Sequence, residues 1–187
     1  METITMPANV HKALSKLVRD GAGYGRFARL SQRRYLCRAL WTDTYRIVAF
    51  EWQAPERVEG DLHMYVNRDD LRSHPAKAKE PATFARESLL CPEPVDDLLG
   101  KDGFKRCLDE PFMRRYDSTR YKGVRRVTYD VKLLSGLLDA FALACPHACV
   151  HVVLPPDDVS SVGFEAHDFE LEVPTSAFAA LMPVREA

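Results

Sequence analysis

The stretch ALWTDTYRIVAFEW, residues 39–52, decides the fold class that the sequence predicts. Two apolar, aromatic-rich runs flank a polar segment, and this pattern predicts two antiparallel strands joined by a turn. The turn contains neither glycine nor Asn-Gly, the usual residues of a tight hairpin. It contains two threonines, a carboxylate, a tyrosine and an arginine instead, which makes it the first candidate for a functional site: Thr42, Asp43, Thr44, Tyr45 and Arg46.

The N-terminal part of the chain surrounds this hairpin with one long helix and further strands. The helix is predicted over residues 10–20, with Asn9 as its N-cap and Gly21 at its end. Strands are predicted before and after the hairpin, at residues 2–6, 27–32, 33–41 and 62–67. A short helix is predicted to follow them at 68–73.

The C-terminal part repeats this order of strand, helix and antiparallel strands without clear sequence identity. A strand at 125–129 leads into a helix that begins near Asp130 and is apolar nearly all round, so we expect its burial on more than one side. Three more strands are predicted at 148–155, 160–166 and 168–175, and the last apolar run predicts another. The two ends together predict an α+β protein, with helices on one face of antiparallel sheets.

The middle of the chain does not follow this plan. Its short helical patterns, such as FARESLL at 84–90, are broken by prolines and glycines. We therefore divide the chain into a first half at 1–74, an irregular or helical insert at 75–123 and a second half at 124–187.

The net charge of −1 hides a strong segregation of charge. Residues 1–52 carry nine basic and four acidic residues, which gives +5, and residues 133–187 carry one and eight, which gives −7. A molecule with such blocks can present a basic face to a polyanion. Lys12, Lys16 and Arg19 share one helix face because they are spaced i, i+4 and i+7. The alternative for this face is simple solvation.

A second basic cluster lies near the end of the insert, with tyrosines between its members. It offers phosphate contacts and base stacking, or it is an exposed loop. Its residues are Arg114, Arg115, Tyr116, Arg120, Tyr121, Lys122, Arg125 and Arg126.

Several classes of function find no support in the sequence. No segment approaches the roughly 20 apolar residues of a membrane span, so no membrane partner is expected. No nucleophile, zinc-protease or nucleotide-binding motif is present, so we expect no enzyme and no cofactor. The five cysteines form no CxxC pair, and the N-terminus has no apolar signal core, which indicates reduced thiols in a cytoplasmic protein.

Cys145, His147, Cys149 and His151 have a spacing that invites a zinc interpretation. On a strand, alternate side chains lie about 6.6–7 Å apart on one face. Zinc ligands must all lie about 2.0–2.3 Å from one ion. At most two neighbours could converge, so we expect no metal site.

Three stretches resemble the DNA sliding-clamp fold, and specifically the bacterial polymerase III beta-clamp family. The segment from Trp41 to Ile47 is similar to the family's Ala-Thr-Asp-Gly-His/Tyr-Arg-Leu. The segment from Val127 to Leu138 resembles the strand-helix entry before the clamp's last strands. Leu181-Met182-Pro183-Val184-Arg185 is close to the family's terminal Met-Pro-Met-Arg. The order matches over roughly residues 1–70 and 125–187, whereas the middle matches nothing.

The resemblance implies that the turn and the tail lie side by side and border a shallow apolar pocket for short linear peptides. Its floor would be Ile47, Met182, Pro183 and Val184, and its rim Thr42, Thr44, Arg46 and Arg185; Tyr45 also belongs to the implied pocket. Two departures bear on this site: Thr44 replaces the family's glycine, which adopts positive φ cheaply, and Trp41 replaces alanine. The alternative is a plain hairpin turn beside a C-terminal edge strand.

The resemblance also implies a function without catalysis. The chain would tether replication or repair proteins to double-stranded DNA, with the Lys12, Lys16 and Arg19 face meeting phosphates independently of base sequence. Because the chain is too short for the family's three-domain subunit, a ring would need a homo-oligomer of several copies, such as three or six. The alternative is a clamp-fold adaptor that binds protein peptides without encircling DNA.

Overall fold

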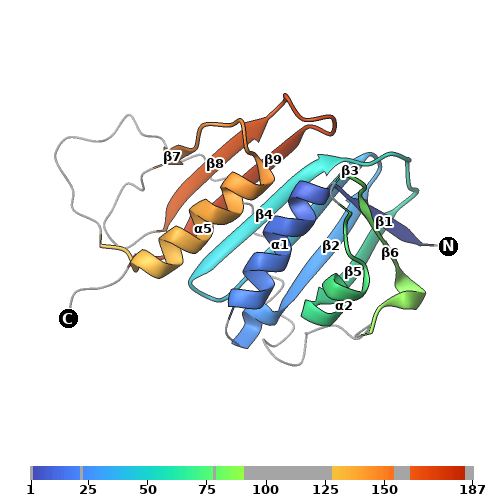
Figure 1. Cartoon of the computed structure of the whole chain (residues 1–187), viewed down its shortest axis with the longest axis horizontal. Coiled ribbons are helices and arrows are strands. Elements are labelled where there is room, and N and C mark those ends of the chain that lie inside the picture. Colours follow the sequence, from blue (N-terminus) through green and yellow to red (C-terminus); the bar gives the residue numbers. More distant parts are fainter. Residues whose placement is uncertain (1, 22, 78, 91–127, 154–160, 184–187) are drawn as a thin grey trace.

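A computed structural model describes residues 2–21, 23–77, 79–90, 128–153 and 161–183. Seven antiparallel strands form one sheet in the order β5-β2-β3-β4-β9-β8-β7, and helices α1 and α5 lie side by side on one of its faces (Figure 1). The α+β prediction is therefore confirmed. The helices are α1 (Ala8–Asp20), α2 (Arg68–Ser73) and α5 (Val131–Ala144). The strands of the large sheet are β2 (Phe27–Arg33), β3 (Leu36–Thr42), β4 (Arg46–Gln53), β5 (Asp61–Asn67), β7 (His151–Val153), β8 (Val162–Asp168) and β9 (Thr175–Leu181).

Strands β4 and β9 join the two ends of the chain into this one sheet. They pair antiparallel from Arg46 opposite Leu181 to Trp52 opposite Thr175. A separate two-stranded ribbon pairs β1 (Thr3–Met6) with β6 (Ala82–Ala85) beside α1 and α2 (Figure 1). Two short 3-10 turns, η1 (Gly23–Arg26) and η2 (Arg86–Ser88), complete the described elements.

The core lies between the sheet and the two helices. Side chains alternate between the faces of a strand, and inward positions such as Trp41 and Phe50 are buried together with Leu14 of α1 and Phe141 of α5. Burying a side chain of this size stabilises the fold by about 1.5–3 kcal/mol. The position of both helices is therefore set by the inward apolar face of the sheet.

Helix α1 ends at Gly21 as expected, but its N-terminus differs from the prediction. Pro7 is the N-cap and Asn9 lies inside the helix. The Asn9 side-chain amide donates to the carbonyl of Ala144 at 2.5 Å. The last carbonyls of a helix have no partner within it, so Asn9 satisfies one of these at the end of α5 and ties the two helices together.

Helix α5 begins as predicted, because the Asp130 carboxylate caps the N–H groups of Lys132 and Leu133. It buries one stripe that includes Leu137 and Phe141, while 78% of Val131 is exposed. The helix packs on the sheet and against α1, so it is covered on more than one side as expected, whereas its outward apolar residues stay exposed.

Three other local predictions need correction. Residues 84–90 form no α-helix: they begin in β6, where Phe84 is fully buried and paired opposite Ile4, and only the short 3-10 turn η2 follows. Residues 169–174 form no strand, because the Asp168 carboxylate accepts the N–H of Glu170 and closes a turn before β9. Residues 128–129 also form no strand, and 125–127 lie outside the described residues.

The division into two halves and an insert stays a prediction, because 91–127 lie outside the described residues. The second basic cluster, from Arg114 to Arg126, falls in the same range. Within the described part of the chain, no helix is both long and apolar enough to cross a membrane.

Candidate functional site

Side chains close the turn between β3 and β4 in place of glycine. Asp43 Oδ1 accepts the backbone N–H groups of Tyr45 and Arg46 at 3.2 and 2.8 Å. The Thr42 hydroxyl donates to the Arg46 carbonyl at 2.8 Å, and it accepts the N–H of Thr44 at 3.1 Å. Thr44 has a φ of 76°, which is unfavourable for a residue with a branched Cβ. These hydrogen bonds hold it there, so the unusual composition builds the turn itself.

Arg46 extends this network from the turn to helix α5. Its Nε and Nη2 donate to Asp43 Oδ2 at 2.9 and 2.6 Å, and its Nη1 donates to the Leu133 carbonyl at 3.1 Å. The guanidinium also lies over the ring of Trp41, 5.1 Å from its centroid, a favourable cation–π geometry. Only 5% of Arg46 is exposed. The side chain is therefore a buried connection between the hairpin and α5.

Gly136 leaves the space that this connection needs. A Cβ at position 136 would lie 2.8 Å from Arg46 Nη1. This glycine lies inside α5, where glycine costs roughly 0.5–1 kcal/mol relative to alanine. The close approach of the guanidinium gives the physical reason for its place in the helix.

The rim that we expected for a peptide groove is partly absent. Arg46 and Thr42 are both buried and their polar atoms are bonded within the hairpin. Successive residues of a strand face opposite sides of the sheet. Arg46 thus points to α5, whereas its neighbour Ile47 points away from the helices and cannot share a groove with its guanidinium.

The hairpin and the tail do lie together, although they are far apart in the sequence. The N–H of Met182 donates to the Tyr45 carbonyl at 2.9 Å, directly after the pairing of Leu181 with Arg46. Tyr45 is 62% exposed and Met182 is 46% exposed. We call Thr44, Tyr45, Ile47, Met182 and Pro183 the hairpin–tail corner. Val184 and Arg185 lie outside the described residues.

Trp41 does not fill the space at this corner. It is buried on the helix side of the sheet, and its Nε1 donates to the Gly25 carbonyl at 2.5 Å. Peptide binding by the corner stays a prediction, with Tyr45 and Met182 as its exposed apolar surface.

The three basic residues predicted on α1 do share one face, but carboxylates neutralise two of them. Lys16 Nζ lies 2.5 Å from Asp139 Oδ2 on α5, and Arg19 Nε lies 2.8 Å from Asp20 Oδ1. The hydrogen bond from Arg19 lowers the pKa of Asp20 below its ordinary value. No carboxylate partner is found for Lys12 among the described residues, and its side chain is exposed.

A groove of about 650 Å³ runs beside this face, between α1 and α2. The α2 wall adds two arginines that the sequence interpretation missed, Arg68 and Arg72. Their i, i+4 spacing places them on one face of a short helix, and this spacing was the available signal. Leu71, Pro75, Ala76 and Leu143 supply the apolar part of the groove.

His11 also lines this groove but does not add to its charge. Its Nε2 lies 3.0 Å from the Leu71 carbonyl, and its ring stacks on Phe84 at 6.3 Å. Burial lowers the pKa of His11 below its ordinary value of 6.5. The imidazole is therefore neutral at pH 7 and acts as a packing residue between α1 and α2.

The cysteines and histidines with the zinc-like spacing have different contacts in the structure. Cys145 is buried against the Thr175 carbonyl, burial raises the pKa of its thiol to about 12, and His147 contacts the Asp168 carboxylate. Among the described residues, no group of three or more potential ligands is close enough to hold a metal ion.

Comparison with known proteins identifies the fold. No family model and no curated protein matches the sequence. Among solved structures, a DNA polymerase sliding clamp from Pseudomonas aeruginosa aligns with a TM-score of 0.58 and 11% identity, over 98% of this chain and 67% of that chain. The structure of the FEN-1 C-terminal region bound to A. fulgidus PCNA aligns with a TM-score of 0.55 and 10% identity, over all of both chains. The beta subunit of DNA polymerase III from Thermotoga maritima aligns with a TM-score of 0.50 and 11% identity, over 98% and 66%.

These likenesses confirm the resemblance at the level of the fold. The chain has the sliding-clamp fold, with its helices on one face of a continuous antiparallel sheet. At 10–11% identity the comparisons carry the fold alone.

Proposed function

We propose that this clamp-fold chain acts without catalysis, as a cytoplasmic tether that holds partner proteins on double-stranded DNA. The observation that carries the proposal is the position of the basic face of α1. It lies in the helix layer of a sliding-clamp fold, with Lys12 and Arg19 exposed to solvent. Phosphate contacts from this layer are independent of base sequence and weaken as salt rises.

Retention on DNA tests this proposal. The wild-type chain should bind a short fluorescent duplex at about 50 mM salt, equally for unrelated base sequences, and the variant K12Q/K16Q/R19Q should lose most of this affinity. Glutamine is preferred to glutamate because a carboxylate at position 16 would repel Asp139. Absence of wild-type binding in every oligomeric state would remove the DNA part of the proposal.

The proposal places the partner's peptide at the hairpin–tail corner. Tyr45 and Met182 offer an exposed apolar surface, and methionine adapts to varied ligands. Burial of a leucine or aromatic anchor there contributes about 1.5–3 kcal/mol. The guanidinium of Arg46 is committed to Asp43 and α5, so it supplies no polar contact to a peptide at the corner.

Weak binding of a leucine- and phenylalanine-containing peptide, measured by NMR shift changes, tests the corner. The variant Y45A/M182A should remove the shifts while the fold survives, because both side chains are half exposed. V152A, a comparable truncation on the exposed edge strand β7, is the matched control. Equal binding by Y45A/M182A and wild type would exclude this corner as the peptide site.

A clamp-fold adaptor that does not encircle DNA is the second candidate. The ion pairs Lys16–Asp139 and Arg19–Asp20 favour it, because they neutralise two of the three basic side chains on α1. Mass measurement in solution separates the two: a closed homo-oligomer with salt-sensitive DNA binding supports the clamp, and a monomer that binds only peptide supports the adaptor.

A further inference from the structure

We infer that the groove between α1 and α2 is a phosphate-backbone track, with Arg68 and Arg72 as its second wall. This inference rests on the proposed DNA-tethering function and goes beyond it. The proposed function requires only the basic face of α1. The groove would give the backbone of one DNA strand a defined path between α1 and α2.

The composition of the groove supports an anionic occupant. Five cationic side chains line it, and none of its lining residues is a carboxylate: Lys12, Lys16 and Arg19 come from α1, and Arg68 and Arg72 from α2. Three carboxylates pair with members of this set from outside the groove, Asp20, Asp69 and Asp139. Five positive and three negative charges leave a local excess of +2 facing the groove.

Two members of the set have no carboxylate partner among the described residues, and they stand on opposite walls. These are Lys12 on α1 and Arg68 on α2, and both are exposed. The ion pair between Arg72 and Asp69 is weak, since Nη1 lies 3.9 Å from Oδ1 and both side chains are exposed. Exposed pairs of this kind contribute about 0–1 kcal/mol, so a phosphate can displace the carboxylate.

The α2 wall is held rigidly although the helix has only six residues. Asn67 accepts the N–H groups of Asp69 and Asp70, and the Asp70 carboxylate accepts the N–H of Asn67 in return. Asp70 is fully buried, and it also accepts the N–H of Leu90 at 2.5 Å. A fixed short helix presents both guanidiniums in one direction, which suits repeated phosphates along a strand.

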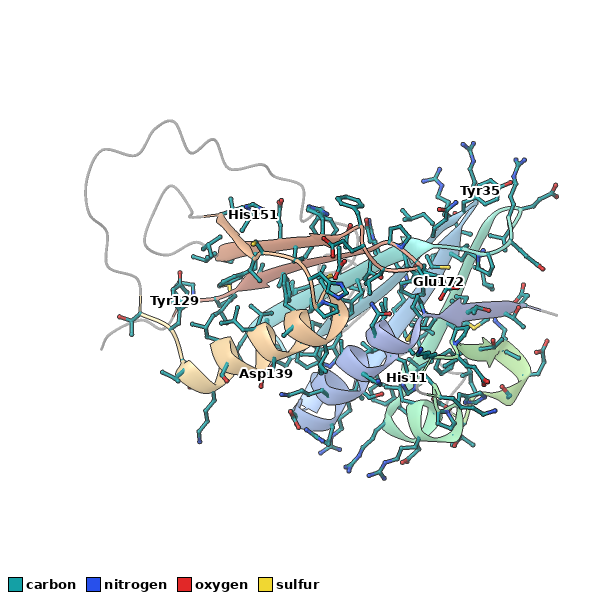
Figure 2. All side chains as sticks on the ribbon, turned by 45° about the horizontal axis from the view of Figure 1, so that its top comes forward. His11, Tyr35, Tyr129, Asp139, His151 and Glu172 are labelled. Carbon is teal, nitrogen blue, oxygen red and sulfur yellow. The ribbon has the colours of Figure 1, made fainter. Side chains whose placement is uncertain are left out.

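The arrangement in Figure 2 agrees with this path. Nitrogen-tipped side chains project from α1 and α2 away from the sheet, beside the labelled His11. The labelled Asp139 lies on α5, which contributes Leu143 and no basic residue to the groove. The backbone contacts therefore belong to α1 and α2, and α5 lies to one side of the track.

The test compares the salt dependence of DNA binding in matched variants. Anisotropy of a labelled duplex is measured for the wild-type chain between 50 and 200 mM salt, with a single strand of the same length and inorganic phosphate as separate arms. Each phosphate contact contributes about −0.9 to the slope of log K against log salt. Three contacts, from Lys12, Arg68 and Arg72, predict a loss of about 40-fold over this range, and one contact a loss of about 3.5-fold.

R68Q/R72Q should therefore shift the loss from about 40-fold to about 3.5-fold, with an unchanged circular dichroism spectrum. R33Q/R57Q is the control, because both arginines are exposed and Arg33 lies opposite Asp61, at the far end of β5 from α2. This control should retain the wild-type slope. R68Q/R72Q could instead weaken binding of the single strand more than binding of the duplex. The groove would then still be the track, and an unpaired strand would supply its phosphates.

Two outcomes would overturn the inference, and they differ in what they leave standing. If K12Q/K16Q/R19Q weakens binding while R68Q/R72Q matches the control, DNA tethering survives and the α2 wall is excluded. If the wild-type chain binds no nucleic acid, or only inorganic phosphate, the track and the DNA part of the proposed function both fail.

Discussion

Helices α1 and α5 lie side by side on one face of the sheet and present different outward surfaces. Helix α1 carries an exposed basic face and forms one wall of the α1–α2 groove. Helix α5 carries an acidic residue, Asp139, and exposed apolar residues such as Val131 and Leu138. The clamp fold therefore constrains how each helix packs inward, while the outward face of each helix is free to differ. A search for DNA contacts in this chain therefore has to treat its two halves separately.

Besides the β4–β9 pairing and the Lys16–Asp139 ion pair, two partly buried side-chain contacts connect the N-terminal and C-terminal parts of the chain, and they make this coupling testable. Arg46 reaches from the hairpin to Leu133 of α5, and Asn9 reaches from α1 to Ala144 at the other end of α5. These two contacts hold the first and the last turn of the same helix. Removing each of them in turn shows how far the halves depend on one another.

The largest effect is expected from Arg46→Ala. This change leaves the buried carboxylate of Asp43 without its cation and removes the bond to Leu133, so the free energy of unfolding should fall by about 3–5 kcal/mol. Chemical denaturation measures it. The double variant R46M/D43N, which removes both charges and keeps an oxygen acceptor in the turn, should recover part of the loss. An equal loss in the double variant would show that the charge pair is not the cause.

A smaller effect is expected from Asn9→Ala. The carbonyl of Ala144 is then left without the Asn9 donor at a buried helix end, which should cost about 1–3 kcal/mol. Asn9→Asp is the sharper control, because it keeps the size of the side chain and lacks the donor. If Asn9→Asp were as stable as wild type in thermal unfolding, the hydrogen bond would contribute nothing to the docking of α1 on α5.

The smallest effect is the pH dependence of the folding stability that comes from His11. Because burial lowers the pKa of His11 in the folded state, the unfolded chain binds a proton more readily below pH 6.5. The contribution of His11 to stability is therefore complete above this pH and is lost as pH falls through the folded-state pKa. Urea titrations at pH 7.5 and 5.5 should show this loss in wild type and a smaller one in His11→Gln. The same pH dependence in both proteins would assign the effect to other groups.

Much of the fold could be predicted from the sequence because its signals are local. The apolar, aromatic-rich run at 46–53 gives a strand, and 3.6-residue periodicity at 10–20 gives a helix, whatever lies elsewhere in the chain. The strand predicted at 168–175 failed for a tertiary reason. Its alternation is real, but the buried carboxylate of Asp168 organises a turn and also accepts the N–H of His147.

The candidate site was predicted less well because it depends on which face each residue takes. The sequence indicated that the turn at 42–46 was unusual, and the family resemblance placed the tail beside it. Only the pairing of β4 with β9 determined that Arg46 faces α5 and Ile47 faces away. A shift of one residue in that register would exchange the two faces.

By itself, the sequence determined the α+β class, the extent of most helices and strands, and the shared face of Lys12, Lys16 and Arg19. Only the folded chain shows that Lys16 pairs with Asp139 and that Arg68 lines the same groove as Lys16. The physical reason is the range of the interactions. Backbone hydrogen bonding and helix periodicity act over a few neighbouring residues, whereas ion pairs and grooves form between segments that come together only when the whole sheet has formed.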